Sequence, residues 1–354
     1  MSIFTDTMLE WYASHKRELP WRDTSDPYII WISEIILQQT RVEQGRDYFL
    51  RFVGRFPDAR TLADASDDEV MTYWQGLGYY SRARNLLAAA RAMNGTFPST
   101  YQGVLALPGV GEYTAAAICS FAYGMPYAVV DGNVYRVLAR YFGIDTPIDT
   151  IPGKRLFAAL ADEMLDRLHP ALYNQAIMDF GATQCVPRSP TCATCPLADS
   201  CAALASGRVA SLPVKRHRTK TTDRYLYYLY VRAGTYTFIH KRTADDIWKG
   251  LFELPLIEAT SPLSPDEFLA HPSLQAMFAP GERRELRLVC QGVKHLLSHR
   301  VLHADLYEVT LPEDTASFSS FLKIRREALG EYAVPRLVQL LVEAIPPDKS
   351  VGDR

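Results

Sequence analysis

Residues 107–115 read Leu-Pro-Gly-Val-Gly-Glu-Tyr-Thr-Ala, and this segment decides the fold that the sequence predicts. Its glycines, Gly109 and Gly111, allow a tight turn between two helices predicted at 101–106 and 113–122. The second helix would begin with backbone N–H groups that have no partner inside the helix, and such groups can hold a phosphate without a charged side chain. An ordinary turn between two helices has the same local pattern, so the segment alone leaves both interpretations open.

The helical pattern extends from this turn in both directions. Residues 28–37 are apolar at eight of ten positions, which predicts a helix buried on all sides. Short turns rich in glycine and proline separate the other segments. Further helices are predicted at 61–74, 81–93, 132–141, 153–167 and 170–181. The sequence therefore predicts an all-α first domain at residues 1–206.

The pattern changes after residues 207–224, a basic segment that we interpret as a linker between domains, although a solvated loop would look the same. Runs rich in β-branched and aromatic residues follow, as is typical of strands. The predicted strands are 225–231, 236–240, 285–290 and 301–309, and two helices are predicted at 266–268 and 334–344. The second domain, at 225–345, is thus predicted to be a small α+β unit, with a polar tail at 346–354.

The composition excludes several classes of protein. The chain has 354 residues, which predicts about two domains. Hydrophobic residues make up 48% and charged residues 22%, as in soluble globular proteins, and the net charge of −2 means that any anion must bind a local basic patch. The N-terminus has no pattern of a secretory signal, and the longest uncharged run contains Gly124 and Pro126, which break a helix. We therefore expect a bacterial-type cytoplasmic protein associated with the nucleoid and with no membrane span, an organellar or nuclear protein being the alternative.

Four of the six cysteines fall within 17 residues, with the spacing C-x6-C-x2-C-x5-C. They are Cys185, Cys192, Cys195 and Cys201. Clustered thiols in a chain without a secretion signal are typical of a metal site. Four thiolates suit either zinc or an iron–sulfur cluster, so the spacing predicts the site and leaves the metal open.

Two acidic residues are candidates for acid–base chemistry. Glu34 lies in the most apolar predicted helix, where loss of solvation should raise its pKa and keep a proton on it near neutral pH. A structural glutamate paired with a buried arginine would show the same pattern. Asp131 ends an apolar run and precedes a predicted helix, so it could face a developing positive charge or only cap that helix.

Five motifs occur in order along the chain: Trp21-Arg22 with Ser33–Thr40, Gly76–Tyr80, Leu107–Thr114, Val130–Val134 and the four-cysteine loop. Over nearly its whole length the sequence closely resembles the adenine DNA glycosylases (the MutY family) of the helix–hairpin–helix superfamily. The resemblance implies an all-α glycosylase domain with a [4Fe–4S] cluster in the loop 185–201, followed by a Nudix-like domain that recognises the lesion. It also implies base excision repair of double-stranded DNA: a monofunctional enzyme, expected as a monomer, removes adenine mispaired with 8-oxoguanine or guanine, and other repair proteins are possible partners.

The resemblance assigns roles to individual residues. Glu34 would donate a proton to N7 of adenine, and Asp131 would stabilise an oxocarbenium-like sugar, with Tyr113 and Asn133 forming hydrogen bonds around the site. Gln39 and Tyr80 match positions that wedge into the vacated base stack, although such residues also serve in cores and caps. The further positions implied to contact DNA are Arg17, Trp21, Arg22, Gly109, Gly111, Gln175 and Asp179.

The second domain contains the positions that the family uses to read 8-oxoguanine. Ser298 and His299 match two of them and lie between two predicted strands, whereas Leu297 stands where the family often has phenylalanine. A serine hydroxyl can accept a hydrogen bond from the N7–H that 8-oxoguanine has and guanine lacks. A turn in which both residues only satisfy local backbone groups is the alternative.

Three other functions fit the sequence less well. Endonuclease III shares the hairpin, the aspartate and the cysteine spacing, but it has a nucleophilic lysine where this chain has Tyr113, and no lysine occurs between Lys16 and Lys154. A Nudix hydrolase needs the acidic pattern REx2EE, which is absent. A purely structural DNA-binding protein would not need the pair Glu34 and Asp131.

Overall fold

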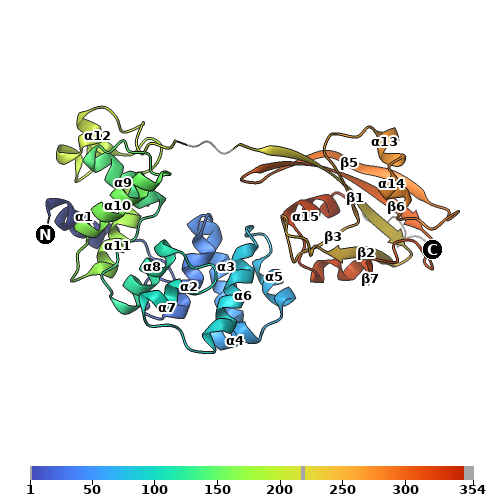
Figure 1. The fold of residues 1–354 in the computed structure, drawn as a ribbon, viewed down its shortest axis with the longest axis horizontal. Coiled ribbons are helices and arrows are strands. Elements are labelled where there is room, and N and C mark those ends of the chain that lie inside the picture. Colours follow the sequence, from blue (N-terminus) through green and yellow to red (C-terminus); the bar gives the residue numbers. More distant parts are fainter. Residues whose placement is uncertain (1, 217–219, 347–354) are drawn as a thin grey trace. The chain divides into compact units, whose positions relative to one another are not determined.

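The computed structural model describes residues 2–216 and 220–346 (Figure 1). These residues form two compact units. The first contains residues 2–65 and 84–216, and the second contains residues 66–83 and 220–346. Within these described ranges, no helix is long and apolar enough to cross a membrane.

The first unit is helical, as predicted. Its helices are α1 (Ile3–His15), α2 (Pro27–Leu37), α3 (Val42–Arg55), α4 (Ala59–Asp64), α7 (Tyr101–Leu105), α8 (Glu112–Tyr123), α9 (Gly132–Phe142), α10 (Ile151–Met164), α11 (Pro170–Asp179) and α12 (Ala202–Ala205). Helix α6 (Ser81–Met93) begins in the second unit, which also contains α5 (Asp67–Trp74). A π-helical turn at Phe180–Gln184 extends α11 toward the cysteines.

The structure corrects the predicted helices at three places. Helices α1 and α3 were not predicted, because polar and acidic residues interrupt their apolar pattern. The helix predicted at 61–74 is two helices, since the chain leaves α4 at Ala65 and Ser66 starts α5 by accepting a hydrogen bond from the backbone N–H of Glu69.

Two helix starts position residues of interest. Helix α2 begins at Pro27 after Asp26, whose side chain accepts from the backbone N–H of Tyr28. Helix α8 follows the hairpin, in which Gly109 has φ 76° and a Cβ would lie 2.7 Å from the Cβ of Asn85. Only glycine fits there, because the conformation is left-handed and the space is filled.

The core of the first unit lies mainly between α1, α8, α9 and α11. Helix α2 is buried from Ile30 to Ile36 and packs against α3 and α8. Glu34 therefore lies within a buried, mainly apolar helix, as the sequence predicts.

The described part of the second unit contains a mixed seven-stranded sheet in the order β3-β2-β1-β6-β5, with β4 paired to β1 and β7 to β2. The strands are β1 (Thr222–Ala233), β2 (Tyr236–Lys241), β3 (Phe252–Glu253), β4 (Leu256–Ala259), β5 (Glu285–Leu296), β6 (Arg300–Leu311) and β7 (Leu322–Arg325). Strands β1 and β6 are parallel, and the other pairs are antiparallel. One face packs against α13 (Pro265–Leu269) and α14 (Pro272–Gln275), and the other against α15 (Arg336–Glu343).

The predicted order of an all-α domain followed by an α+β domain is confirmed. The strands are longer than predicted, because β1 begins at Thr222 and β5 continues to Leu296. Residues of the predicted linker also contact the helical unit: the Val214 carbonyl accepts from the backbone N–H of Ile148, and the backbone N–H of Arg216 donates to Asp149. The middle of the linker, 217–219, and the tail from 347 lie outside the described residues.

Candidate active site

Glu34 has a buried carboxyl group, and the residue is only 7% exposed. Loss of solvation raises its pKa from 4.5 to about 7, and the charge of Asp131 acts in the same direction. A hydrogen bond from Tyr113 and the positive charge of Arg22 oppose this shift. Near neutral pH a large fraction of molecules therefore carries a proton on Glu34, as a general acid requires.

Tyr113 connects the hairpin to Glu34. Its hydroxyl donates to Oε2 of Glu34 at 2.8 Å. Burial raises the pKa of Tyr113 well above its usual value, and the negative charge of Glu34 adds to this, so the phenol remains a donor. Because Tyr113 is the second residue of α8, the turn at Gly109 fixes where this hydroxyl lies.

Asp131 is the N-cap of α9. Its Oδ1 accepts from the backbone N–H groups of Asn133 and Val134, each at 2.8 Å, and Nδ2 of Asn133 donates to Oδ2 at 2.7 Å. Burial raises the pKa of Asp131, although these hydrogen bonds act in the opposite direction. The carboxyl group is therefore fixed in orientation before any substrate binds.

Arg136 joins this cap to the cysteine loop. Its Nη2 donates to Oδ1 of Asn133 at 2.8 Å and to the Gly181 carbonyl at 2.6 Å, and its Nε donates to the Cys185 carbonyl at 2.7 Å. A Cβ at Gly181 would lie 2.6 Å from the Cβ of Asn133, so glycine is needed for this close approach. The guanidinium thus holds the Asp131 cap and the start of the cysteine loop in one arrangement.

A second polar cluster is centred on Asp179, whose side chain is fully buried. Arg17 donates to Oδ1 through Nε at 2.9 Å and Nη2 at 2.6 Å, and Arg22 donates through Nη2 at 2.7 Å. Arg22 also donates to the Tyr12 hydroxyl at 2.9 Å, which in turn donates to Oε1 of Gln175 at 3.0 Å. Asp179 therefore holds two arginines and has no open side for a base.

Arg22 links this cluster to the carboxyl of Glu34, because its positive charge lowers the pKa of that group. Trp21 is 6% exposed and its ring lies edge-on to Phe49, with 5.1 Å between centroids. The structure thus gathers four of the predicted pocket residues in one hydrogen-bonded cluster, while Trp21 packs in the core. These four are Arg17, Arg22, Gln175 and Asp179.

The two residues predicted to enter the base stack differ in exposure. Gln39 is exposed and has φ 57°, so it lies at a sharp turn after α2. Tyr80 is only 6% exposed, and its hydroxyl accepts from the backbone N–H of Gly76. The prediction that Tyr80 is a wedge is therefore wrong. The neighbouring Tyr79 is 45% exposed at φ 46°, and its hydroxyl is hydrogen-bonded to the hydroxyl of Ser298.

The hairpin leaves its second helix open to a ligand. Gly111 is the N-cap of α8 and forms no side-chain capping hydrogen bond. A Cβ at Gly111 would meet nothing within 4 Å, so the space beside the helix start is open. This geometry fits the phosphate contact predicted for Gly109 and Gly111.

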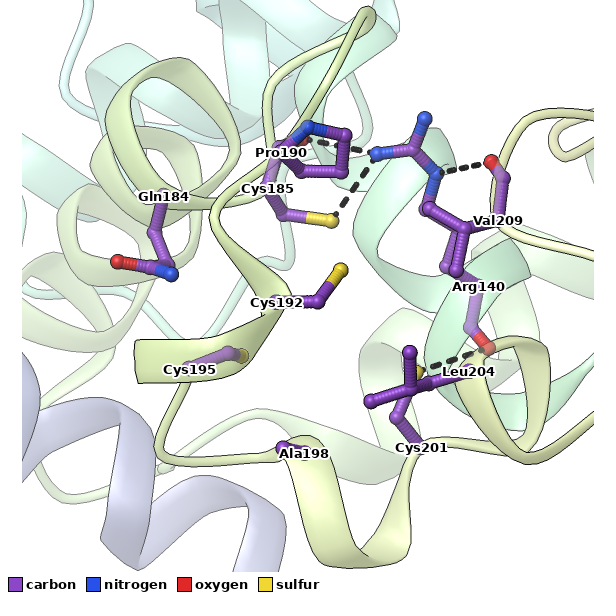
Figure 2. Close-up of a pocket in the computed structure, with 10 residues that line it drawn as sticks. All are labelled: Arg140, Gln184, Cys185, Pro190, Cys192, Cys195, Ala198, Cys201, Leu204 and Val209. Atoms are coloured by element: carbon purple, nitrogen blue, oxygen red, sulfur yellow. Dashed lines mark hydrogen bonds between the residues drawn. The ribbon is translucent and has the colours of Figure 1, made fainter. Parts of the chain in front are cut away.

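The four clustered cysteines line one cavity (Figure 2). Arg140 donates through Nη1 to Sγ of Cys185 at 3.4 Å and to the Val186 carbonyl at 2.8 Å, and its own carbonyl lies 3.6 Å from Sγ of Cys201. Burial raises the pKa of Cys185, against the hydrogen bond and charge of Arg140, and it raises that of Cys195 to about 11, so burial disfavours both thiolates.

The donor set limits which groups fit this cavity. Four cysteine thiols line it together, and four thiolates are the ligands that an iron–sulfur cluster takes. Zinc can use the same four ligands in tetrahedral geometry. The cavity therefore fits either group.

Ser298 and His299 lie in the turn between β5 and β6, and both are exposed. The backbone N–H of Leu297 donates to the Arg300 carbonyl at 2.8 Å, which closes a two-residue turn. The predicted loop position of these two polar residues is confirmed, and β5 extends to the residue before Leu297.

The prediction from sequence missed Tyr12, Arg136 and Arg140. Arg136 and Arg140 are four residues apart on α9, so they share a face, and both are buried. Two arginines with this spacing among apolar residues, soon after Asp131, are a signal that the sequence does contain. Tyr12 has no such signal, because it joins Arg22 to Gln175, which lies 163 positions away in the chain.

Comparisons with known proteins agree with this geometry. Residues 32–160 match the family model described as HhH-GPD superfamily base excision DNA repair protein, and residues 227–344 match a NUDIX domain. The adenine DNA glycosylase of Buchnera aphidicola subsp. Baizongia pistaciae is 33% identical, and the match covers 85% of this chain and 84% of that protein. The human adenine DNA glycosylase is 39% identical over 60% of this chain and 43% of that protein.

Solved structures resemble the helical part. A thermostable thymine-DNA glycosylase is 30% identical with a TM-score of 0.54, and the match covers 58% of this chain and 96% of that one. Endonuclease III in a non-covalent complex with DNA, 21% identical with a TM-score of 0.50 over 58% of this chain and 94% of that one, shares the fold. With both domains matched and relatives aligned over most of its length, the chain belongs to the adenine DNA glycosylase family, enzymes that hydrolyse N-glycosyl bonds in base excision repair.

Proposed function

We propose that this adenine glycosylase removes adenine mispaired with 8-oxoguanine or guanine in double-stranded DNA, as a monomer in the bacterial cytoplasm. The observation that carries the proposal is the buried Glu34, with a pKa raised to about 7, hydrogen-bonded to Tyr113 and close enough to Asp131 for their charges to interact. Two carboxyl groups with different environments can divide acid and electrostatic roles between them.

The reaction begins with a proton on the leaving group. Protonated Glu34 donates to N7 of the flipped adenine, the C1′–N9 bond breaks, and adenine leaves with its bonding electrons as a neutral base. Asp131 faces the positive charge that develops on the sugar and stabilises it. The carboxylate of Glu34 then takes a proton from water, whose oxygen adds to C1′ and completes hydrolysis.

The cluster of Arg17, Arg22 and Asp179 supplies the pocket for the base. Arg22 lies between Asp179 and the carboxyl of Glu34, and Gln175 presents an amide that can pair with an adenine edge. Because Asp179 is already saturated by two arginines, its role is to position them. Truncation of Asp179 should therefore impair binding of adenine through Arg17 and Arg22.

The cysteine loop would hold a [4Fe–4S] cluster through Cys185, Cys192, Cys195 and Cys201. When bound, the cluster supplies a rigid crosslink that orders the loop. Arg136 and Arg140 connect that loop to α9, and so to Asp131. Protein purified without oxygen should contain about four irons per chain. Analysis that finds one zinc and no iron would overturn the cluster assignment.

The decisive assay uses four duplexes that carry adenine opposite 8-oxoguanine, guanine, cytosine or thymine. Strand breaks should form only after alkali treatment, only in the adenine strand, and fastest opposite 8-oxoguanine. Breaks without alkali would indicate a lyase, and equal rates on all four duplexes would overturn the mispair assignment.

Recognition of 8-oxoguanine by Ser298 and His299 can be tested separately. In the double variant Ser298→Ala, His299→Ala, the preference for adenine opposite 8-oxoguanine over adenine opposite guanine should narrow, since a base contact of this kind contributes about 1–3 kcal/mol. Excision opposite guanine should change little. Equal slowing on both substrates would indicate lost folding or lost general affinity for DNA instead.

A further inference from the structure

The turn that carries Ser298 and His299 also presents an apolar side chain on the opposite face of the sheet from Leu297. Leu296 is 68% exposed, although it is the last residue of a long strand. Leu297, the residue in the family's phenylalanine position, packs instead against the core that contains Leu302 and Leu337. The two neighbouring leucines therefore have different environments.

Strand pairing explains this difference. Leu296 is paired with Val301, and Lys294 is paired with His303, so these four residues share a face. Further along β6 the same face carries Tyr307, which is covered by Phe268 of α13 at 4.2 Å between ring centroids. The covering helices α13 and α14 lie toward the other end of the β5–β6 hairpin (Figure 1), which leaves Leu296 open at the turn.

The turn is held firmly on its other face. Arg300, which follows His299, donates to Oδ1 of Asp246 at 3.0 Å. Asp246 also accepts from Arg224 at 2.9 Å and from Arg242 at 3.1 Å. Together with the partly buried side chain of Leu297, which packs against the core, this cluster anchors the core-facing side of the turn.

We infer that Leu296, and not Leu297, is the apolar residue of this chain that contacts the DNA beside the base opposite the target adenine. The inference rests on the proposed function, because it takes Ser298 as the residue that reads that base. Two residues of extended chain span at most about 7 Å. Stacked bases are about 3.4 Å apart along one strand, so Leu296 lies within about two base steps of Ser298.

The chemistry of the surface fits a distorted duplex. Leucine is one of the apolar side chains that proteins insert between base steps, and a flipped adenine leaves the opposite base without its pairing partner. Lys294, on the same face two residues away, supplies a positive charge for the adjoining phosphate. Leu296 and Val301 form an apolar pair directly beside the polar turn.

The test compares variants of three leucines in the full chain. The probe is a duplex with 8-oxoguanine opposite a 2′-fluoro-adenine, which resists cleavage, and with 2-aminopurine next to the 8-oxoguanine. Leu296→Ala should weaken binding about tenfold and reduce the fluorescence gain that accompanies unstacking. Leu296→Met, which keeps the apolar bulk, should restore most of both signals.

Leu288→Ala is the matched control, since Leu288 is a 42% exposed leucine on the same strand and face but far from the turn. It should behave like wild type. Leu297→Ala should lower the melting temperature and leave the fluorescence gain of the folded protein intact. The inference is overturned if Leu296→Ala matches Leu288→Ala, or if only Leu297→Ala loses the fluorescence gain. Excision opposite 8-oxoguanine by wild type tests the proposed function separately.

Discussion

The active site of the helical unit and the arginine cluster under the β5–β6 turn both contain a carboxyl group withdrawn from water, with opposite results. Glu34 has one neutral donor, Tyr113, and burial raises its pKa to about 7. Asp246 is also partly desolvated, which acts to raise its pKa, but hydrogen bonds and charge from Arg224, with further charge from Arg300, lower it to about 2. Burial alone therefore does not determine protonation. The number of cationic donors within hydrogen-bonding distance does.

The difference distinguishes the carboxyl group that we propose as the general acid, that of Glu34, from the structural carboxyl group of Asp246. A general acid must give up its proton near neutral pH, so its surroundings have to disfavour the ion without excluding it. A structural carboxylate stabilises the fold best when it stays ionised among its partners. Each of these environments can be tested by removing the charge.

The largest expected effect is on catalysis. Glu34→Gln should bind DNA normally but lose excision by at least 10²–10⁴-fold, because an amide cannot deliver a proton. Glu43→Gln, an exposed change on α3, should behave like wild type. Single-turnover excision on adenine opposite guanine measures both. A Glu34→Gln rate within tenfold of wild type would show that Glu34 is not the acid.

The same substitution should stabilise the fold at alkaline pH. Because the pKa of Glu34 is 4.5 in an unfolded chain and about 7 in the fold, the folded state loses stability as pH rises from 4.5 through 7. The full loss is roughly 3 kcal/mol. Calorimetry should thus show a higher melting temperature for Glu34→Gln than for wild type at pH 8 and little difference at pH 5. An equal shift at both pH values would contradict a raised pKa.

Asp246→Asn should change the stability of the fold in the opposite direction. It should destabilise the protein at neutral pH, and by a smaller free energy than the Glu34 effect. Ionised Asp246 contributes stability that is present above pH 3.8 and is lost as pH falls through about 2. Its removal should therefore cost roughly 2 kcal/mol at pH 7, measured by urea unfolding. Asp245→Asn is the control, because the Asp245 side chain is 97% exposed and pairs only loosely with Lys249. Equal effects of Asp246→Asn and Asp245→Asn would show that the interactions of Asp246 with its arginines add no stability.

The smallest expected effect is a shift in the pH dependence of excision when Tyr113, whose hydroxyl donates to Glu34, is changed. Tyr113→Phe removes a hydrogen bond that lowers the pKa of Glu34, so this pKa should rise and the alkaline limb of the excision rate should move to higher pH by less than about one unit. Tyr123→Phe on the same helix, whose hydroxyl donates to the Pro98 carbonyl, should leave the limb in place. A shift to lower pH would mean that Tyr113 does not stabilise the carboxylate.

Local sequence predicted those residues whose roles depend on their neighbours in the chain. Asp131 caps α9 because it directly precedes that helix, and Gly109 forms the hairpin because no other residue fits its backbone. The two adjacent tyrosines show where this reasoning fails. Tyr79 and Tyr80 have the same chemistry and the same local pattern, and only the turn through Gly76 and Gly78 decides that Tyr80 is buried and Tyr79 is exposed.

The sequence by itself determined the two-domain order, the helical hairpin, the clustered cysteines and the apolar setting of Glu34, because each follows from composition, periodicity or spacing over a few residues. Only the tertiary structure decided that Tyr113 donates to Glu34, that Arg136 joins Asn133 to Cys185, and that Asp179 holds two arginines. The physical reason is that these contacts join residues up to 162 positions apart. A hydrogen bond needs its two atoms within about 3 Å, and only the packed fold can place distant residues so accurately.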